Sequence, residues 1–237
     1  MVRNSFDKEL EHLHGLMVKM SAMVEESIEN SVIAFKKQDV SLAKQVFESD
    51  DTIDDMESKI EKICINLIAR QQPLAKDLRT ISTALKIITD MERIADHAAD
   101  IAELTIRMAD LKQVKPLIDI PLMADLAKKM VTKSIDSYVK QDIALAKAVC
   151  DSDDEVDNLF SKIVLELINI MKNNPETVEQ ATDYMFVVKY LERIGDHATN
   201  IAEWVVFNVT GSHEHLAGKM SKFIFYGVTK CQSRLFL

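Results

Sequence analysis

The sequence predicts an all-α fold, a tandem duplication of an antiparallel three-helix bundle with six long helices. The first observation behind this prediction is compositional: the chain of 237 residues contains only 5 Gly and 4 Pro. Because Gly and Pro mark turns, a chain poor in both has long uninterrupted elements. Barrels and sandwiches, which need a turn about every ten residues, are therefore disfavoured.

The second observation is an internal repeat. Glu92–Glu103 (ERIADHAADIAE) and Glu192–Glu203 (ERIGDHATNIAE) are identical at nine of twelve positions. Earlier in each repeat, Lys37–Lys44 (KQDVSLAK) and Lys140–Lys147 (KQDIALAK) agree at six of eight positions. Self-similarity at a fixed spacing, here about 100 residues, indicates a duplicated structural unit.

The third observation is the spacing of apolar residues, which between residues 40 and 70 follows the 3.6-residue period of an amphipathic helix. Pro73 and Pro175 stand at equivalent places near the second turn of each repeat, while Pro116 and Pro121 stand between the repeats. Long helices joined by short connections must lie antiparallel. The expected helices span residues 6–36, 40–70, 75–110, 119–139, 143–172 and 177–210.

These elements predict three segments along the chain. Residues 1–113 form a first three-helix bundle, and residues 114–212 form a second. Residues 213–237 have no counterpart in the first repeat. This C-terminal tail is more basic and more aromatic than the rest, and its sequence does not predict a structure for it.

Composition and charge exclude several classes of protein. With 29 Lys and Arg against 38 Asp and Glu, the chain has a net charge of −9, and such an acidic balance disfavours nucleic-acid binding. The three isolated cysteines, Cys64, Cys150 and Cys231, form neither a disulfide framework nor a CxxC metal motif. The charged N-terminal sequence lacks the apolar core of a signal peptide, and no uncharged run is long enough to span a bilayer. We therefore expect a cytoplasmic protein without a transmembrane segment.

Acidic residues form a stripe on the third helix of each repeat and recur on the helix before it. Like charges four residues apart on a helix repel each other, and no basic residue interrupts the stripe, so a bound cation would turn repulsion into binding energy. Counted from the turns near Pro73 and Pro175, the motifs on the two helices lie level. The candidate ligands are Asp50, Asp54, Glu92, Asp96 and Asp100 in the first repeat and Asp153, Asp157, Glu192, Asp196 and Asn200 in the second.

Carboxylates with little imidazole or thiol favour an oxygen-preferring cation, such as Mg, Mn or Fe, over a structural zinc. The alternative is a solvated helix face, since the acidic stripe lies nearly opposite the apolar residues of the same helix. His97 and His197 follow the central Asp of each stripe but point away from it. We interpret both histidines as surface or packing residues rather than ligands.

The repeated ERIADHAAD and ERIGDHATN segments, together with RQQPLAKDLR at Arg70–Arg79, resemble the PhoU family of phosphate-signalling accessory proteins. The resemblance covers nearly all of both repeats. It implies two three-helix bundles, a cytoplasmic homodimer and surface multinuclear iron or zinc clusters at the paired acidic motifs. Two features depart from the family pattern: Asn200 stands where the first repeat has Asp100, and RQQPLAKDLR has no clear copy in the second repeat.

The function implied by the resemblance is regulatory rather than enzymatic. Such a protein couples the ATPase of a phosphate ABC transporter to a sensor histidine kinase at the cytoplasmic face of the membrane, and thereby negatively regulates phosphate-starvation genes. In agreement, the sequence shows no nucleophile–base pair and no Gly-rich phosphate loop.

Three alternatives remain open. DDTID and DDEVD fit the DDxxD motif of magnesium-dependent isoprenoid synthases, but basic residues to hold a diphosphate are missing near the motifs. A ferritin-like di-iron enzyme fits less well, because the ExxH spacing is absent. The third alternative is a metal-free helical adaptor, which elemental analysis of the purified protein would distinguish.

Overall fold

The computed structural model describes residues 2–71, 73–111, 119–213 and 216, and within them it contains helices and no strand. All six expected helices are confirmed, with ends that agree within a few residues. The helices are α1 (Val2–Lys37), α2 (Val40–Gln71), α3 (Ala75–Arg107), α4 (Asp119–Lys140), α5 (Ile143–Asn173) and α6 (Val178–Thr210), with a short 3-10 turn, η1 (Pro175–Thr177), before α6.

The repeated KQD motif forms the first turn of each repeat. Gln38 and Gln141 both adopt the left-handed conformation, with φ of 52° and 53°, which reverses the chain between two antiparallel helices. The following residue, Asp39 or Asp142, accepts a hydrogen bond from the backbone N–H three residues later, at 3.0 Å in both repeats. This N-cap satisfies a donor that the first turn of the next helix would otherwise leave free. The sequence repeat therefore preserves a complete turn geometry.

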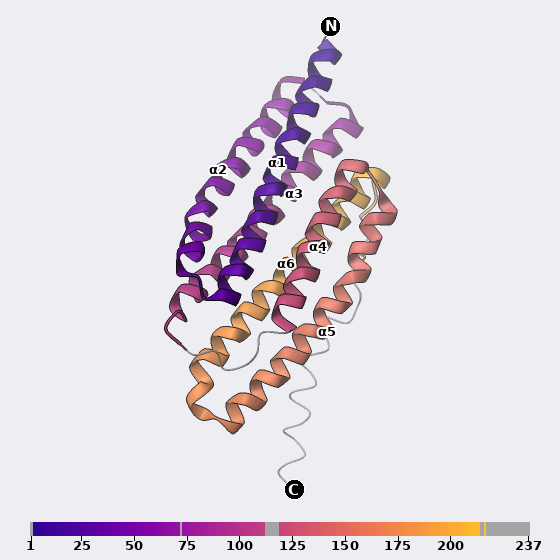
Figure 1. Cartoon of the computed structure of the whole chain (residues 1–237). Coiled ribbons are helices and arrows are strands. Elements are labelled where there is room, and N and C mark those ends of the chain that lie inside the picture. The colour runs from indigo at the N-terminus through magenta and orange to yellow at the C-terminus, as the bar shows by residue number, and fades with distance from the viewer. Residues whose placement is uncertain (1, 72, 112–118, 214–215, 217–237) are drawn as a thin grey trace.

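The two repeats meet mainly through α3 and α6, while α2 and α5 lie at opposite edges of the molecule (Figure 1). Near the start of α3, Thr80 Oγ1 donates to Asn208 Oδ1 near the end of α6 at 3.2 Å. Near the end of α3, Arg107 Nε donates to Asp183 Oδ2 near the start of α6 at 3.3 Å. Because early residues of one helix pair with late residues of the other, α3 and α6 are antiparallel and the repeats are related by an approximate two-fold axis.

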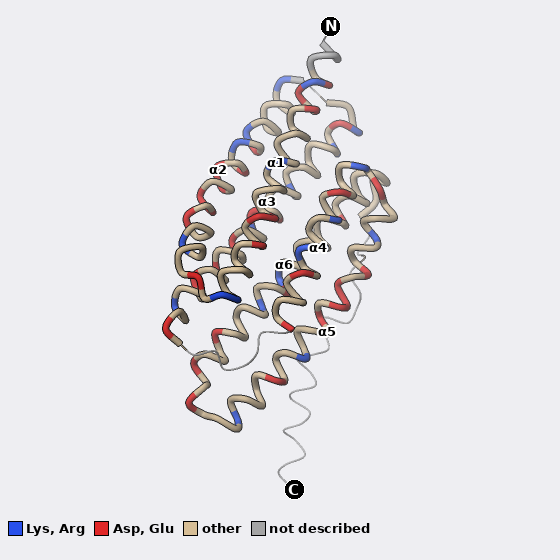
Figure 2. Tube along the Cα trace, in the orientation of Figure 1, with Lys and Arg blue, Asp and Glu red and all other residues tan. Residues whose placement is uncertain are grey.

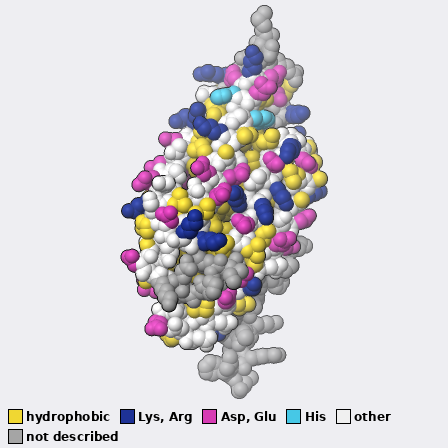
Figure 3. All heavy atoms as spheres, in the orientation of Figure 1, with side chains coloured by type: hydrophobic (Ala, Val, Ile, Leu, Met, Phe, Trp, Pro, Cys, Tyr) yellow, Lys and Arg dark blue, Asp and Glu magenta, His cyan; other side chains and the backbone are white. Residues whose placement is uncertain are grey.

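One apolar core runs through both repeats, since a single cluster of buried side chains draws on all six helices. A fully buried member from each helix illustrates this: Met20, Ile60, Met91, Met130, Ile163 and Leu191. On the face shown in Figure 3, the exposed apolar side chains lie in small groups between charged ones. Over the part of the chain that the structure describes, no helix has the length and apolar character needed to cross a membrane. Apart from His213 and Leu216, the predicted C-terminal tail lies outside the described residues.

The shared core predicts that the repeats unfold together. Truncation of Leu191, which is 0% exposed, to alanine should lower the free energy of unfolding by about 3 kcal/mol, through lost apolar contact and the cavity left behind. Leu165 is 60% exposed on the neighbouring helix, and Leu165→Ala should change stability by less than about 0.5 kcal/mol. Urea unfolding followed by circular dichroism should show one transition in each case. Two separate transitions would contradict a common core.

Candidate metal centre

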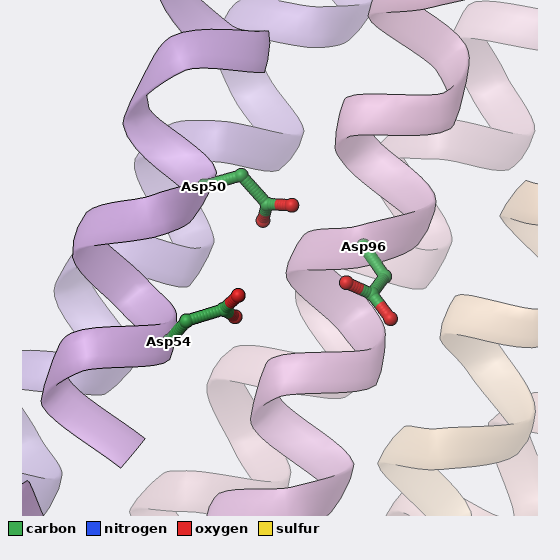
Figure 4. A group of neighbouring side chains, drawn as sticks. All are labelled: Asp50, Asp54 and Asp96. Carbon is green, nitrogen blue, oxygen red and sulfur yellow. The ribbon is translucent and has the colours of Figure 1, made fainter. Parts of the chain in front are cut away.

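Three carboxylates from two helices converge in the first repeat. Asp50 and Asp54 lie one turn apart on α2, and Asp96 faces them from α3 (Figure 4). One carboxylate oxygen of each residue lies within 4.8 Å of the others. The level placement predicted by counting from the turn is therefore confirmed for these three residues. We call them the first carboxylate centre.

Burial makes the charges of this centre costly. Asp50 Oδ1 is buried and has no hydrogen-bond partner. Burial, and then the negative charge of Asp96, raises the pKa of Asp50 to about 6 and that of Glu92 to about 7. A buried carboxylate without a partner is costly unless a cation compensates it. The arrangement is therefore suited to hold a positive charge between α2 and α3.

The expectation that the acidic stripe lacks basic compensation was wrong. Arg93 Nη1 lies 3.0 Å from Asp96 Oδ2, and Arg93 Nε lies 3.3 Å from Glu92 Oε2. Arg93 projects from α3 beside the stripe, but its side chain is long enough to reach back to it. The Arg93 side chain is 55% exposed, so water screens its charge and it compensates the buried carboxylates only in part.

Basic side chains also accompany the second stripe. Arg193 Nη1 lies 3.2 Å from Asp196 Oδ2, and Lys189 forms an ion pair with Glu192. Figure 2 shows the resulting distribution of acidic and basic residues along the helices. Basic residues do stand near the DDxxD motifs, contrary to expectation, since the charge of Arg93 acts on Asp54 and that of Lys189 on Asp157. The shared core, packed with apolar side chains from all six helices, still differs from the central cavity that the isoprenoid synthases require.

The second repeat brings its acidic residues together more loosely. Gly195 replaces the Ala95 of the first repeat, and a Cβ at Gly195 would lie 3.4 Å from Asp153 Oδ1, an ordinary van der Waals contact. Burial, followed by the charges of Asp157, Asp196 and Glu192, raises the pKa of Asp153 to about 7. Among the described residues, the close grouping of three ligand atoms occurs in the first repeat and not here. We call Asp153, Asp157, Glu192 and Asp196 the second carboxylate centre.

The last residue of each predicted stripe points instead towards the seam between α3 and α6. Asn200 Nδ2 donates to Asp90 Oδ1 at 3.2 Å. Asp100 Oδ2 lies 3.4 Å from His97 Nδ1, although its charge still contributes to the raised pKa of Asp50. Neither residue belongs to the group of three convergent carboxylates.

The seam contains residues that sequence reasoning missed. His197 Nδ1 lies 2.8 Å from Asp90 Oδ1, and the His97 ring stacks on Tyr190 with ring centroids 5.4 Å apart. The two histidine rings are themselves 5.7 Å apart, so both pack at the seam as interpreted. Positions 90 and 190 are equivalent in the two repeats. An antiparallel alignment of α3 with α6 would therefore have placed Asp90 beside His197 and Tyr190 beside His97.

Fold and site together define a class of duplicated helical-bundle protein with a carboxylate centre between two helices of each repeat. The chain matches the model of the PhoU domain over residues 17–105 and 120–205. A "phosphate-specific transport system accessory protein PhoU homolog" of Clostridium acetobutylicum is 42% identical over 217 residues, which cover 91% of this chain and 99% of that protein. A protein of the same description from Aquifex aeolicus is 40% identical, with 90% of this chain and 97% of that protein covered.

Solved structures agree with this result. The crystal structure of PhoU from Pseudomonas aeruginosa matches with a TM-score of 0.85 at 34% identity, covering 87% of this chain and 100% of that chain. PhoU from Streptococcus pneumoniae, described as a phosphate transport system regulatory protein, matches with a TM-score of 0.82 at 26% identity. The chain belongs to the PhoU family.

The raised pKa values predict an unusual dependence of stability on pH. In a chelating buffer, Asp50 and Glu92 titrate near pH 4 in the unfolded chain, but at about 6 and about 7 in the folded chain. The folded chain therefore holds more protons between these values, and the free energy of unfolding should fall as pH rises from about 4 to about 7. The double variant Asp50→Asn/Glu92→Gln should show a shallower fall in urea unfolding measured across this range.

A matched control removes two exposed carboxylates of α1, in Glu9→Gln/Glu11→Gln, and should keep the slope of the original chain. If the free energy of unfolding changed with pH equally in all three proteins, folding would not raise the pKa values of Asp50 and Glu92.

Proposed function

We propose that this chain is an accessory regulator of a phosphate transport system. In this role it couples the ATPase of a phosphate ABC transporter to a sensor histidine kinase, and represses phosphate-starvation genes when phosphate is plentiful. The observation that carries the proposal is the match of both repeats to the PhoU domain. Relatives at 40–42% identity, matched over nearly their whole length, bear the name of phosphate transport accessory proteins. The proposed place of action is the cytoplasmic face of the membrane, as a homodimer.

We further propose that the carboxylate centres bind metal ions. The first centre fits this role because it presents three convergent carboxylates, one of which has a buried oxygen without a partner. Asp50, Asp54 and Asp96 would hold the metal, with Glu92 beside them. An all-oxygen donor set suits iron, manganese or magnesium, and family resemblance adds iron or zinc clusters.

The second centre would bind metal more weakly. Asp196 and Glu192 already pair with Arg193 and Lys189, and Asn200 donates its amide to Asp90 instead of offering a carboxylate. A cation would have to displace ion pairs at either centre, but among the described residues three ligand atoms group closely in the first centre and not in the second. The two repeats are thus proposed to differ in metal affinity despite their common origin.

The role proposed for these carboxylates is to make partner docking depend on metal. Asp50 and Asp54 come from α2 and Asp96 from α3, so their joint ligation would fix the spacing of two helices at the surface. A bound cation also reduces the local negative charge, which an approaching acidic or basic partner surface would sense. No covalent step is required of the chain in this role.

Elemental analysis tests metal binding. The full chain, purified without chelator or affinity metal, should retain metal, whereas Asp54→Asn/Asp96→Asn should lower affinity at the first centre by more than about tenfold, since it removes two charged ligands. The matched control is Glu9→Gln/Glu11→Gln, which removes the same charge from α1 and should retain the metal. Absence of metal from all three proteins would favour the metal-free adaptor.

A reporter assay tests regulation separately. In a bacterium that lacks its own PhoU protein, this chain should restore repression of a phosphate-starvation reporter in phosphate-rich medium. Asp54→Asn/Asp96→Asn should fail to restore repression although it folds, because the docking surface is incomplete without metal. If the variant represses as well as the original chain, the metal is incidental. If the original chain binds metal but does not repress, the regulatory proposal is contradicted.

A further inference from the structure

Beyond the first carboxylate centre, α3 carries two further carboxylates on its solvent side. Asp100 lies one turn after Asp96 and Glu103 a turn further on, so the three share one side of the helix. The arginines of this stripe are engaged elsewhere, since Arg93 pairs with Asp96 and Arg107 pairs with α6. Within the part of the chain that the structure describes, neither Asp100 nor Glu103 pairs with a lysine or an arginine. Their negative charge is therefore available to a partner.

An exposed aromatic ring borders these carboxylates on α2. Phe47 is 52% exposed and lies three residues before Asp50 and seven before Asp54, a spacing that places the three on one side of the helix. The next residue inwards, Val46, is buried in a small apolar cluster with Ala102 of α3. Phe47 is therefore level with the stretch of α3 that carries the two free carboxylates.

A second exposed aromatic ring borders the same stretch on α6. The stack of His97 on Tyr190 sets the register of the antiparallel pair α3 and α6. Phe186 lies four residues before Tyr190, so it is level with the turn of α3 after His97, where Asp100 stands. The Phe186 ring is 49% exposed and stacks on Tyr190 with centroids 6.5 Å apart. Burial, and then the charges of Asp100 and Glu103, raises the pKa of Tyr190, in agreement with their proximity.

Since α3 packs against both α2 and α6, aromatic rings flank its free carboxylates on two sides. We call this surface the α3 face and define it by five residues: Phe47, Asp100, Glu103, Tyr190 and Phe186.

The duplication provides an internal comparison, because the equivalent positions of the second repeat do not form such a surface. In the same order, they are Cys150, Asn200, Glu203, Asp90 and Lys86. Cys150 is buried, and Glu203 is buried and accepts a hydrogen bond from the backbone N–H of Leu216 at 2.7 Å. Lys86 stands where the first face has an aromatic ring. The combination of exposed rings and free carboxylates is thus a property of the first repeat.

The chemistry of the α3 face favours one kind of occupant. Exposed apolar side chains rimmed by polar ones mark interaction surfaces. An arginine suits this surface best, because its guanidinium stacks on aromatic rings and donates to carboxylates in a planar fork. An anionic membrane would be repelled by the carboxylates, and so would a second copy of a chain with a net charge of −9.

We propose that the α3 face binds a basic amphipathic helix of a partner protein, with apolar side chains on Phe47 and Phe186 and arginine on Asp100 and Glu103. The inference rests on the regulatory function proposed above and names the chemistry of the partner surface. Phe47 comes from α2 and the carboxylates come from α3, so a metal that fixes the spacing of these helices also fixes the two parts of the face.

Binding of a synthetic peptide tests the proposal. Neighbouring helices pack about 8–10 Å apart, so rings two helices apart are separated by about 16–20 Å, or roughly three helical turns. The probe is a fluorescent helical peptide of Ala and Gln with Leu at i and i+11 and Arg at i+4 and i+7, all on one side. Fluorescence anisotropy with the full chain should show binding weakened more than about tenfold by Phe47→Ala/Phe186→Ala and about fivefold by Asp100→Asn/Glu103→Gln.

Matched controls separate this face from general charge and apolar effects. Glu9→Gln/Glu11→Gln removes the same charge from α1, and Val18→Ala/Leu165→Ala truncates two apolar side chains that are also exposed. Both control variants should bind the probe as the original chain does. A peptide with its arginines moved to the opposite side of the helix should bind more weakly than the probe. Equal losses in control and face variants, or no loss in the face variants, would overturn the proposal.

Other occupants and the role of metal give distinct results. Size-exclusion chromatography with light scattering should show the same oligomeric state for Phe47→Ala/Phe186→Ala as for the original chain. A dimer that this variant converts to a monomer would assign the face to a second copy and overturn the proposal, as would binding to phosphatidylserine vesicles that the variant loses.

The peptide titrations are made both with Mn²⁺ and with chelator. Affinity that depends on the face but not on Mn²⁺ would support the α3 face and contradict only the metal-dependent docking proposed above. Affinity that depends on Mn²⁺ but not on the face would contradict the α3 face alone.

Discussion

The antiparallel packing of α3 against α6 is the constraint on which the rest of the structure depends. It joins the two repeats through one core and relates them by an approximate two-fold axis. Since α3 supplies Asp96 and α6 supplies Asp196, the same packing fixes the position of one carboxylate centre relative to the other. Between them it places a polar seam in which Asp90 contacts His197 and Asn200. A change in this packing would therefore alter the positions of the carboxylates in both centres.

The first carboxylate centre is maintained against its own electrostatic cost. A folded chain gains nothing from placing Asp50 and Asp54 beside Asp96 unless a positive charge joins them, because burial and the negative charge of Asp96 raise the pKa of Asp50 and of Asp54. Stability given up at a cluster of this kind is characteristic of functional sites. The duplicated second centre has one basic neighbour more: Lys189 pairs with Glu192 and Arg193 with Asp196, whereas Arg93 alone reaches Glu92 and Asp96 in the first centre. One ancestral arrangement has thus produced two electrostatically distinct sites.

Much of this architecture could be predicted from the sequence because it depends on local signals. Helix lengths follow from apolar periodicity and from sparse Gly and Pro, and the level placement of Asp50, Asp54 and Asp96 follows from counting along two helices from a turn. The seam could not be predicted in this way, because Asp90 and Tyr190 acquire partners only when α3 packs against α6. The ion pairs of Arg93 could not be predicted for another reason. The position of Arg93 on the helix fixes only its Cα atom, whereas its long, flexible side chain reaches back to Glu92 and Asp96.

Carboxylates from neighbouring helices are proposed to form a cation site in each repeat, with the higher affinity in the first. The most direct test is anomalous X-ray diffraction from crystals of the full chain grown with Mn²⁺ or Fe²⁺. We expect a strong anomalous peak between Asp50, Asp54 and Asp96, and a weaker peak beside Asp153 and Asp196. Peaks confined to other surfaces, or none at a saturating concentration of metal, would contradict it.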